Sequence, residues 1–190
     1  PLDKDFVDAM AALAQSNDIL LIADEVQIGN GRSGMLYGYM NYGIKPDIVT
    51  TAKGIGGGLP IGITMLGEKV KDVFTPGLNG STFGGNPVCC AGALNILERI
   101  DDKLLNEVKE KSKYIFSELS GAEGIESVTG MGLMIGVKTK KPAKEVVAEC
   151  INNGVLVLTA KDKVRLLPAL NIPFDLLESG IQTLKRVACK

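Results

Sequence analysis

Ile19-Leu20-Leu21-Ile22-Ala23-Asp24-Glu25 is the stretch that decides the fold, because five aliphatic positions in a row end in two carboxylates. A strand that is apolar at every position, and not only at alternate ones, is typical of a parallel sheet covered on both faces. Ligands of such sheets collect beyond the carboxyl ends of the strands. We therefore predict a buried parallel strand with Asp24 at its ligand-binding end.

Two further strands are predicted downstream, at residues 47–51 and 61–66. Between them, Ala52-Lys53-Gly54-Ile55-Gly56-Gly57-Gly58 has too many glycines for an α-helix or a regular strand. Lys53 comes just after the end of one strand, as Asp24 comes at the end of the other. The two side chains could therefore face the same crevice.

The remaining elements indicate an α/β protein. Asp3 is a predicted helix cap, and Asn86-Pro87 is a strong helix start, because Asn suits the cap and Pro the first helical position. A charged amphipathic helix is predicted over 102–120. Beyond it, strands are predicted at 125–128, 133–137, 155–158 and 164–167, and helices at 143–152, which Gly154 stops, and 175–188.

Composition and charge narrow the range of functions. The 190 residues carry 21 basic and 22 acidic side chains in mixed order, which argues against nucleic acid or an anionic membrane as partner. No apolar stretch reaches the roughly 18 residues that a membrane-spanning helix needs. The chain lacks histidine, so acid–base chemistry would fall to other side chains and a zinc site is poorly supported.

Four cysteines form no CxxC pair, and we interpret them as buried free thiols of a cytoplasmic protein: Cys89, Cys90, Cys150 and Cys189.

Each candidate site residue also has a structural interpretation. A lysine beside glycines is commonly a solvated loop residue, and an aspartate at a strand end is commonly a turn or cap. Gly29-Asn30-Gly31-Arg32-Ser33-Gly34 matches the GxGxxG pattern of dinucleotide-binding loops, with Asp47 downstream as a candidate ribose ligand. Against it, Asp24 and Glu25 place negative charge where a pyrophosphate would bind. A packing or dimerisation module without chemistry is a third hypothesis.

Longer strings bear on these alternatives. Residues 20–62 (LLIADEVQIGNGRSGMLYGYMNYGIKPDIVTTAKGIGGGLPIG) and 80–97 (GSTFGGNPVCCAGALNIL) closely resemble class III, ornithine/acetylornithine-type aminotransferases. TGMGLMIGVK at 129–138, GVLVL at 154–158 and VRLLPALNI at 164–172 continue the resemblance nearly to the last residue. The segments DEVQ, TTAK and GSTFGGNP together are highly specific to that family.

The resemblance implies a fold and a cofactor. The chain would be the C-terminal half of a pyridoxal 5'-phosphate (PLP) dependent transferase of fold type I. Residues 1–101 would belong to the large cofactor-binding domain, and residues 102–190 would form a linking helix and the small C-terminal domain. Lys53 would carry the cofactor as an aldimine and move the substrate Cα proton, while Asp24 would keep the pyridine nitrogen protonated.

Other residues of the family's site fall on matching positions. Val26 would pack against the cofactor ring, and Gln27 would hydrogen-bond its phenolic oxygen. Thr82, with Ser81 nearby, would reach the phosphate held by the neighbouring subunit of a homodimer. Arg165 would clamp the substrate carboxylate bidentately. No metal is implied.

The strings are most like the acetylornithine branch of the family. That branch implies amino transfer between N-acetylornithine and 2-oxoglutarate in arginine biosynthesis, in the cytoplasm. Ornithine, succinylornithine and 4-aminobutyrate aminotransferases are the alternatives. The family's phosphate-binding loop and ring-stacking aromatic would lie upstream of Pro1, so we expect this polypeptide alone to bind cofactor poorly and to lack transaminase activity.

Overall fold

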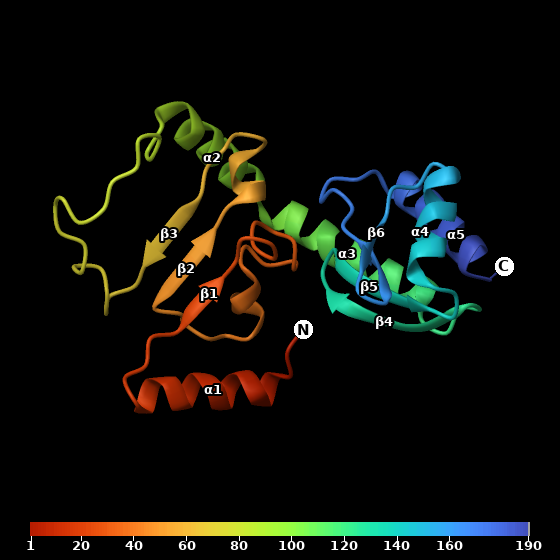
Figure 1. Cartoon of the computed structure of the whole chain (residues 1–190), viewed down its shortest axis with the longest axis horizontal. Helices are drawn as coiled ribbons and strands as arrows, with labels where there is room; N and C mark the ends of the chain where they lie inside the picture. Colours follow the sequence, from red (N-terminus) through yellow and green to blue (C-terminus); the bar gives the residue numbers. More distant parts are fainter. Residues whose placement is uncertain (190) are drawn as a thin grey trace. The chain divides into compact units, whose positions relative to one another are not determined.

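The structure is a computed structural model that describes residues 1–189 (Figure 1). Its chain divides into two compact units. The first unit contains residues 2–31 and 35–102, and the second contains residue 1, residues 32–34 and, within the described chain, residues 103–189. Each unit combines a β-sheet with helices, so the predicted α/β class is confirmed.

The sheet of the first unit has three strands in the order β1 (Ile22–Asp24), β2 (Ile48–Thr51) and β3 (Ile63–Leu66). β1 is parallel to β2, whereas β3 is antiparallel to β2. The sheet is therefore mixed, and its parallel pair is the one that carries Asp24 at a strand end.

The prediction that residues 19–23 form a strand buried on both faces was wrong. β1 has only three residues at the edge of the sheet, and 59% of Ile22 is exposed. The preceding residues lie outside the ladder, where the Leu21 N–H donates to Asp47 Oδ2 (2.8 Å). A hydrophobic pattern predicts which residues favour a buried strand. It does not show that the Asp47 side chain, and not the backbone of a neighbouring strand, accepts the Leu21 N–H.

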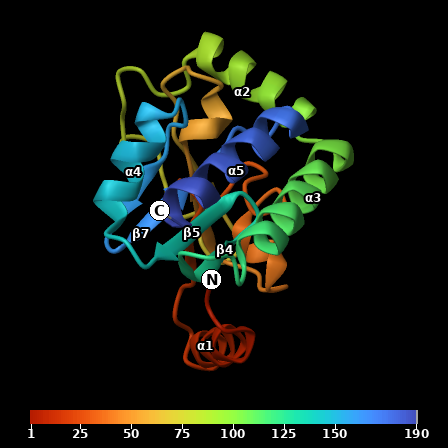
Figure 2. The ribbon, with the colours of Figure 1, turned by 90° about the vertical axis from the view of Figure 1, so that its right-hand side faces the viewer.

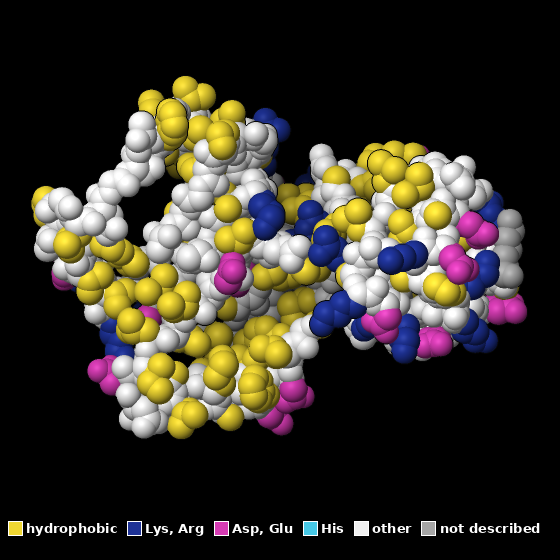
Figure 3. Space-filling view, viewed as in Figure 1, with side chains coloured by type: hydrophobic (Ala, Val, Ile, Leu, Met, Phe, Trp, Pro, Cys, Tyr) yellow, Lys and Arg dark blue, Asp and Glu magenta, His cyan; other side chains and the backbone are white. Residues whose placement is uncertain are grey.

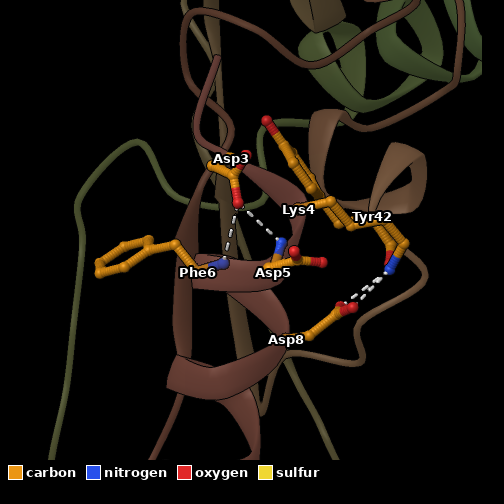
Figure 4. A network of polar contacts seen from close by, with 6 residues as sticks. All are labelled: Asp3, Lys4, Asp5, Phe6, Asp8 and Tyr42. Carbon is orange, nitrogen blue, oxygen red and sulfur yellow. Dashed lines mark hydrogen bonds and ion pairs between the residues drawn. The ribbon is translucent and has the colours of Figure 1, made fainter.

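Helix α1 (Lys4–Ser16) begins at the predicted cap, because Asp3 Oδ1 accepts the N–H groups of Asp5 and Phe6 (Figure 4). The Lys4 ammonium lies against Asp8 one helical turn further on (2.7 Å). Only Val7 of α1 is buried, and apolar side chains gather on the visible surface over this helix (Figure 3). The helix therefore owes its local stability to capping and ion pairing more than to packing.

Helix α2 (Pro87–Arg99) also begins as predicted, since Asn86 Oδ1 accepts the N–H groups of the second and third helical residues (3.0 and 3.2 Å). The helix packs on η2 (Lys53–Gly56), a single 3₁₀ turn that occupies the loop predicted to be neither α-helix nor strand. Gly92 permits the close approach, because a Cβ there would lie 2.6 Å from Leu59 Cδ1.

The second unit is a four-stranded antiparallel sheet with helices, in strand order β4-β5-β7-β6. Its elements in chain order are α3 (Asp102–Leu119), β4 (Ile125–Met131), β5 (Met134–Thr139), α4 (Ala143–Asn152), β6 (Leu158–Ala160), β7 (Lys163–Leu166) and α5 (Phe174–Cys189). The strand predicted at 155–158 was misplaced, because the Val155 N–H donates to the Cys150 carbonyl (2.9 Å) and closes the end of α4.

One hydrophobic core holds the second unit together. Inward residues of β5 and β7, such as Ile135 and Val164, pack in one cluster with the buried faces of all three helices. Figure 2 shows α3, α4 and α5 around this sheet. α3 carries Leu119, which is fully buried, and a charged outer face. Within the described chain, no helix combines the length and apolarity needed to cross a bilayer.

Residues 32–34 belong to the second unit, and Arg32 contacts backbone groups of that unit through both its guanidinium and its own carbonyl. Arg32 Nη1 donates to the carbonyls of Leu133 (3.2 Å) and Pro168 (2.5 Å), and the Arg32 carbonyl accepts the Leu133 N–H (2.9 Å). Burial lowers the pKa of the Arg32 guanidinium. Gly132 is required beside it, because its φ is +56° and a Cβ would collide with the Arg32 carbonyl.

All four cysteines are free thiols. Cys89 and Cys150 are buried and Cys90 is half-buried, but Cys189 is exposed, so the expectation that all four are buried was wrong for this residue. Cys189 lies at the end of α5, where the helix leaves the core.

We predict that Leu119→Ala destabilises the protein by about 2–5 kcal/mol, because it removes a fully buried side chain and leaves a cavity. The midpoint of urea unfolding measures the effect. Lys113→Ala, on the exposed face of the same helix, is the control and should change stability by less than about 0.5 kcal/mol. Equal effects of the two substitutions would contradict the assignment of the core.

Candidate functional site

The sheet of the first unit places Asp24 and Lys53 at the same end, where the carboxyl termini of β1 and β2 lie. β1 and β2 are parallel neighbours whose register pairs Asp24 with Thr50. Asp24 ends β1, and Lys53 begins η2 just after β2 ends at Thr51. Because both strands run in the same direction, the carboxylate and the amine follow their carboxyl ends, where α/β sheets bind ligands.

Lys53 has an unusual backbone conformation. Its φ is +52°, in the left-handed region that costs an ordinary L-residue about 1–2 kcal/mol. Its side chain is exposed, and no ion pair joins its ammonium to another residue within 1–189. Strained backbone is often found where a side chain has a functional task. The amine is therefore presented to solvent by a conformation that the surrounding structure must maintain.

Asp24 is only partly committed to hydrogen bonds within the chain. Its Oδ1 accepts the Val26 N–H (3.0 Å) and lies 3.4 Å from the Thr50 hydroxyl, which donates to it. The residue is exposed. One face of the carboxylate thus orients the side chain at the strand end, and the other oxygen can accept a proton-bearing group of a ligand.

Glu25, the next residue, has a structural role. It is 3% exposed, and its two oxygens accept the N–H groups of Gly38 (2.7 Å) and Tyr39 (2.8 Å) at the start of η1 (Gly38–Asn41). Burial, followed by the proximity of Tyr39 and Glu25, raises the pKa of Tyr37. The two adjacent carboxylates therefore differ in task, because one faces solvent and the other closes a turn.

The dinucleotide hypothesis lacks the element it requires. A GxGxxG loop holds a pyrophosphate at the N-terminus of the α-helix that follows it. Here Gly34 is followed by the short 3₁₀ turn η1, and the next α-helix in the chain is α2. The loop also places residues 32–34 in the second unit. We therefore set this interpretation aside.

Asn30 is a residue of the site region that sequence reasoning missed. It is 6% exposed, and its Nδ2 donates to Thr51 Oγ1 (3.0 Å) and to the carbonyl of Ala52 (3.1 Å). The Thr51 hydroxyl lies 3.3 Å from Asn30 Oδ1. Its φ of +58° suits Asn better than most residues, so an asparagine between two glycines was the available signal.

The other candidates for the cofactor site lie in two separate segments, one just beyond β1 and one between β3 and α2. Val26 is half-buried and Gln27 is exposed, just beyond β1. Ser81 and Thr82 are exposed in the long connection between β3 and α2, which extends away from the sheet in Figure 1. The Ser81 carbonyl accepts the Gly84 N–H (3.2 Å), which forms a turn. No hydrogen bond within 1–189 joins Ser81 or Thr82 to the sheet edge that carries Lys53.

Arg165 lies in the second unit, on β7. The strand alternates, with Val164 and Leu166 buried in the core, so Arg165 projects from the opposite face of the sheet. Its Nε is buried and has no hydrogen-bond partner within the described residues. A buried donor without a partner is costly, and a guanidinium matches a carboxylate through paired N–H groups. Arg165 therefore has the chemistry of an anion ligand.

The groups at the sheet edge suit a pyridoxal cofactor. An aldehyde needs an amine that carries no ion pair, which Lys53 provides, and a pyridinium nitrogen needs a carboxylate, which Asp24 provides. Both groups lie beyond the carboxyl ends of adjacent parallel strands. The donor set therefore fits the cofactor by its chemistry.

Comparison with solved structures defines the class of protein. The N-acetylornithine aminotransferase of Stenotrophomonas maltophilia matches 98% of this chain and 51% of its own, with a TM-score of 0.88 and 30% identity. The ornithine δ-aminotransferase of Plasmodium falciparum matches with the same TM-score at 28% identity. The fold is thus that of part of a PLP-dependent aminotransferase.

Residues 1–188 match the family model described as aminotransferase class-III, so the chain belongs to the class III aminotransferases, a family that uses PLP. Acetylornithine aminotransferases of Haemophilus ducreyi and Clostridium acetobutylicum are 45% and 41% identical to it, over 98% and 95% of this chain. These alignments cover 48% and 49% of the two relatives. The chain therefore spans about half the length of the relatives it matches.

We predict that Glu25→Gln destabilises the protein by about 1.5–3 kcal/mol, because the amide offers only one acceptor to two buried backbone N–H groups. Thermal unfolding measures the loss. Glu98→Gln, exposed on α2, should leave the melting temperature nearly unchanged. A Glu25→Gln variant as stable as wild type would show that this carboxylate does not hold η1.

Proposed function

We propose that the complete protein is a PLP-dependent aminotransferase that moves an amino group between N-acetylornithine and 2-oxoglutarate. The observation that carries the proposal is the exposed amine of Lys53 on a left-handed residue, beyond the end of β2 and beside the strand that ends in Asp24. The family match over residues 1–188 supports it. So do the printed names of the relatives.

Lys53 and Asp24 divide the chemical work in this proposal. When bound, PLP supplies an electron sink for the charge left on the donor Cα. Lys53 would hold the cofactor covalently through its aldehyde group, with loss of water, and its amine, once free, would take the proton from the donor Cα. Asp24 would accept the hydrogen bond of the protonated pyridine nitrogen and so keep the ring cationic.

The neighbouring residues hold the ring and the phosphate. Val26, half-buried just beyond β1, would hold one face of the ring, and the exposed Gln27 amide would donate to the phenolic oxygen. Ser81 and Thr82 bind the phosphate of the neighbouring subunit's cofactor in a homodimer. Their exposure supports this role, since an outward hydroxyl is available to a partner.

Arg165 binds the substrate carboxylate. Its buried Nε without a partner supports this role, because a bidentate carboxylate would satisfy the donor that the chain leaves unpaired. Both the amino donor and the 2-oxo acid acceptor carry such a carboxylate, so one arginine can serve both half-reactions.

Among possible amino donors, the relatives favour N-acetylornithine over ornithine or 4-aminobutyrate. With that donor the enzyme would act in arginine biosynthesis, in the cytoplasm. Because the chain spans about half of its relatives, we propose that the 190-residue polypeptide alone lacks transaminase activity. The assays below therefore use the complete protein.

We predict that the complete protein, loaded with PLP, turns over N-acetylornithine with 2-oxoglutarate faster than it turns over ornithine or 4-aminobutyrate. Lys53→Ala should reduce turnover to the background rate, because it removes the amine that follows the end of β2. Lys45→Ala, an exposed lysine between the two strands, is the control and should keep wild-type turnover. Substantial turnover by Lys53→Ala would overturn the proposed function.

We predict that Arg165→Lys raises the KM of both substrates by about tenfold to a hundredfold, the equivalent of roughly 1.5–3 kcal/mol for a charged hydrogen bond. A lysine keeps the charge but cannot form the paired N–H contacts. Steady-state kinetics with each substrate varied in turn measure the change. Unchanged KM values would place the carboxylate clamp on another residue.

A further inference from the structure

The left-handed backbone at Lys53 requires something that maintains it, since lysine has no intrinsic preference for this region. Within 1–189 only three other non-glycine residues share this conformation, and one of them is Asn30. The two residues are far apart in sequence, yet the Asn30 side chain contacts the peptide group immediately before Lys53. This contact therefore acts on the backbone that sets the conformation of the lysine.

The contact is a part-buried hydrogen bond from the Asn30 side chain to one backbone carbonyl. Asn30 Nδ2 donates to the carbonyl of Ala52 (3.1 Å), and the same carbonyl accepts the Ile55 N–H (3.3 Å), which closes the η2 turn. Asn30 Nδ2 also donates to Thr51 Oγ1 at the end of β2 (3.0 Å). One amide group therefore joins the last residue of the strand to the first turn of the lysine loop.

The surroundings make this tether specific. Asn30 is 6% exposed, so its hydrogen bonds are shielded from competing water. Gly54 lies against the Asn30 side chain, because a Cβ added at Gly54 would be 3.5 Å from the Asn30 Cβ, an ordinary contact distance. Ile55, fully buried, anchors the other side of the turn. The turn is thus fixed by the buried Ile55 side chain and by the Asn30 hydrogen bond, and Lys53 begins it with an exposed side chain.

We propose that Asn30 is a positioning residue for Lys53: its side-chain amide holds the Ala52 carbonyl and thereby keeps the lysine in the left-handed backbone from which its amine reaches the reacting carbon. This inference rests on the proposed function of Lys53. It adds a residue that touches neither the donor nor the cofactor and that acts only through the orientation of the amine.

The variant of choice is Asn30→Gly in the complete protein. Glycine adopts the left-handed φ of position 30 without strain, so the substitution removes the amide and leaves the local backbone allowed. Asn30→Asp is the second variant, because Asp also tolerates this φ and keeps the shape but offers no N–H to the Ala52 carbonyl. Asn41→Gly is the matched control, since the Asn41 amide donates to the Gly38 carbonyl (3.0 Å) in the separate turn η1.

The first measurement is amide hydrogen exchange of the cofactor-free protein. We expect the Ile55 and Gly57 amides, which close the turn, to exchange about tenfold faster in Asn30→Gly and in Asn30→Asp, the loss expected for one hydrogen bond. The Val49 amide in β2 should keep its wild-type rate, as should all three amides in Asn41→Gly. Wild-type exchange at Ile55 and Gly57 in Asn30→Gly would overturn the proposal.

The second measurement is kinetic. With PLP bound, Asn30→Gly should lower kcat about tenfold with substrate KM values near wild type, because a misplaced amine slows proton transfer and not binding. Deuterium at the donor Cα should then give a larger isotope effect than in wild type, which a loss of folded protein alone would not cause. Wild-type kcat and isotope effect in Asn30→Gly would also overturn the proposal.

These outcomes separate the two levels of inference. If Lys53→Ala retains turnover, the proposed function fails and so does the role of Asn30 in it, whatever the exchange rates. If Lys53→Ala is inactive but Asn30→Gly behaves as wild type in exchange and kinetics, the proposed function stands and only the positioning role is lost.

Discussion

The parallel pairing of β1 with β2 is the constraint on which the site depends. The register that sets Asp24 opposite Thr50 makes both strands end at the same end of the sheet, so a carboxylate and an amine about thirty residues apart in the chain both follow that end. An antiparallel pairing would send them to opposite edges. The short strand β1 buries little apolar surface at the edge of the sheet, so it contributes little to stability. Its contribution to function is larger, because it places Asp24.

Hydrogen bonds from neighbouring residues then assign the polar groups at that edge to different tasks. Both carboxylate oxygens of Glu25 accept backbone N–H groups and close a turn. Asp24 uses Oδ1 for the Val26 N–H, and its other oxygen can accept a hydrogen bond from a ligand. Lys53 is left without an ion pair within the described chain, in a backbone conformation that Asn30 can maintain through the preceding carbonyl. The buried polar groups, Glu25 and Asn30, thus hold the backbone of the loops, and the exposed groups, Asp24 and Lys53, are available to a ligand.

Much of this arrangement could be predicted from residues with a strong local preference. Asn86 and Pro87 start α2 as expected, because capping is decided within a few residues. The exposure of Ile22 and the late start of β6 at Leu158 follow from single hydrogen bonds that a hydrophobic pattern does not encode. Asp47, 26 residues away in the chain, accepts the Leu21 N–H before β1, and the Val155 N–H turns back to the end of α4 before β6. The same holds for Asn30, whose role becomes visible only when its amide is seen against Ala52. The proposed tasks of Thr82 and Arg165 come from family resemblance.

Chemical trapping of the cofactor tests the central claim most directly. The complete protein is incubated with PLP, reduced with borohydride and digested, and the labelled peptide is identified by mass spectrometry. The account predicts a pyridoxyl group on Lys53 and none on Lys45 or Lys69, because Lys53 is exposed and follows the end of β2, the parallel neighbour of the strand that ends in Asp24. A label on another lysine, with Lys53 recovered unmodified, would contradict it.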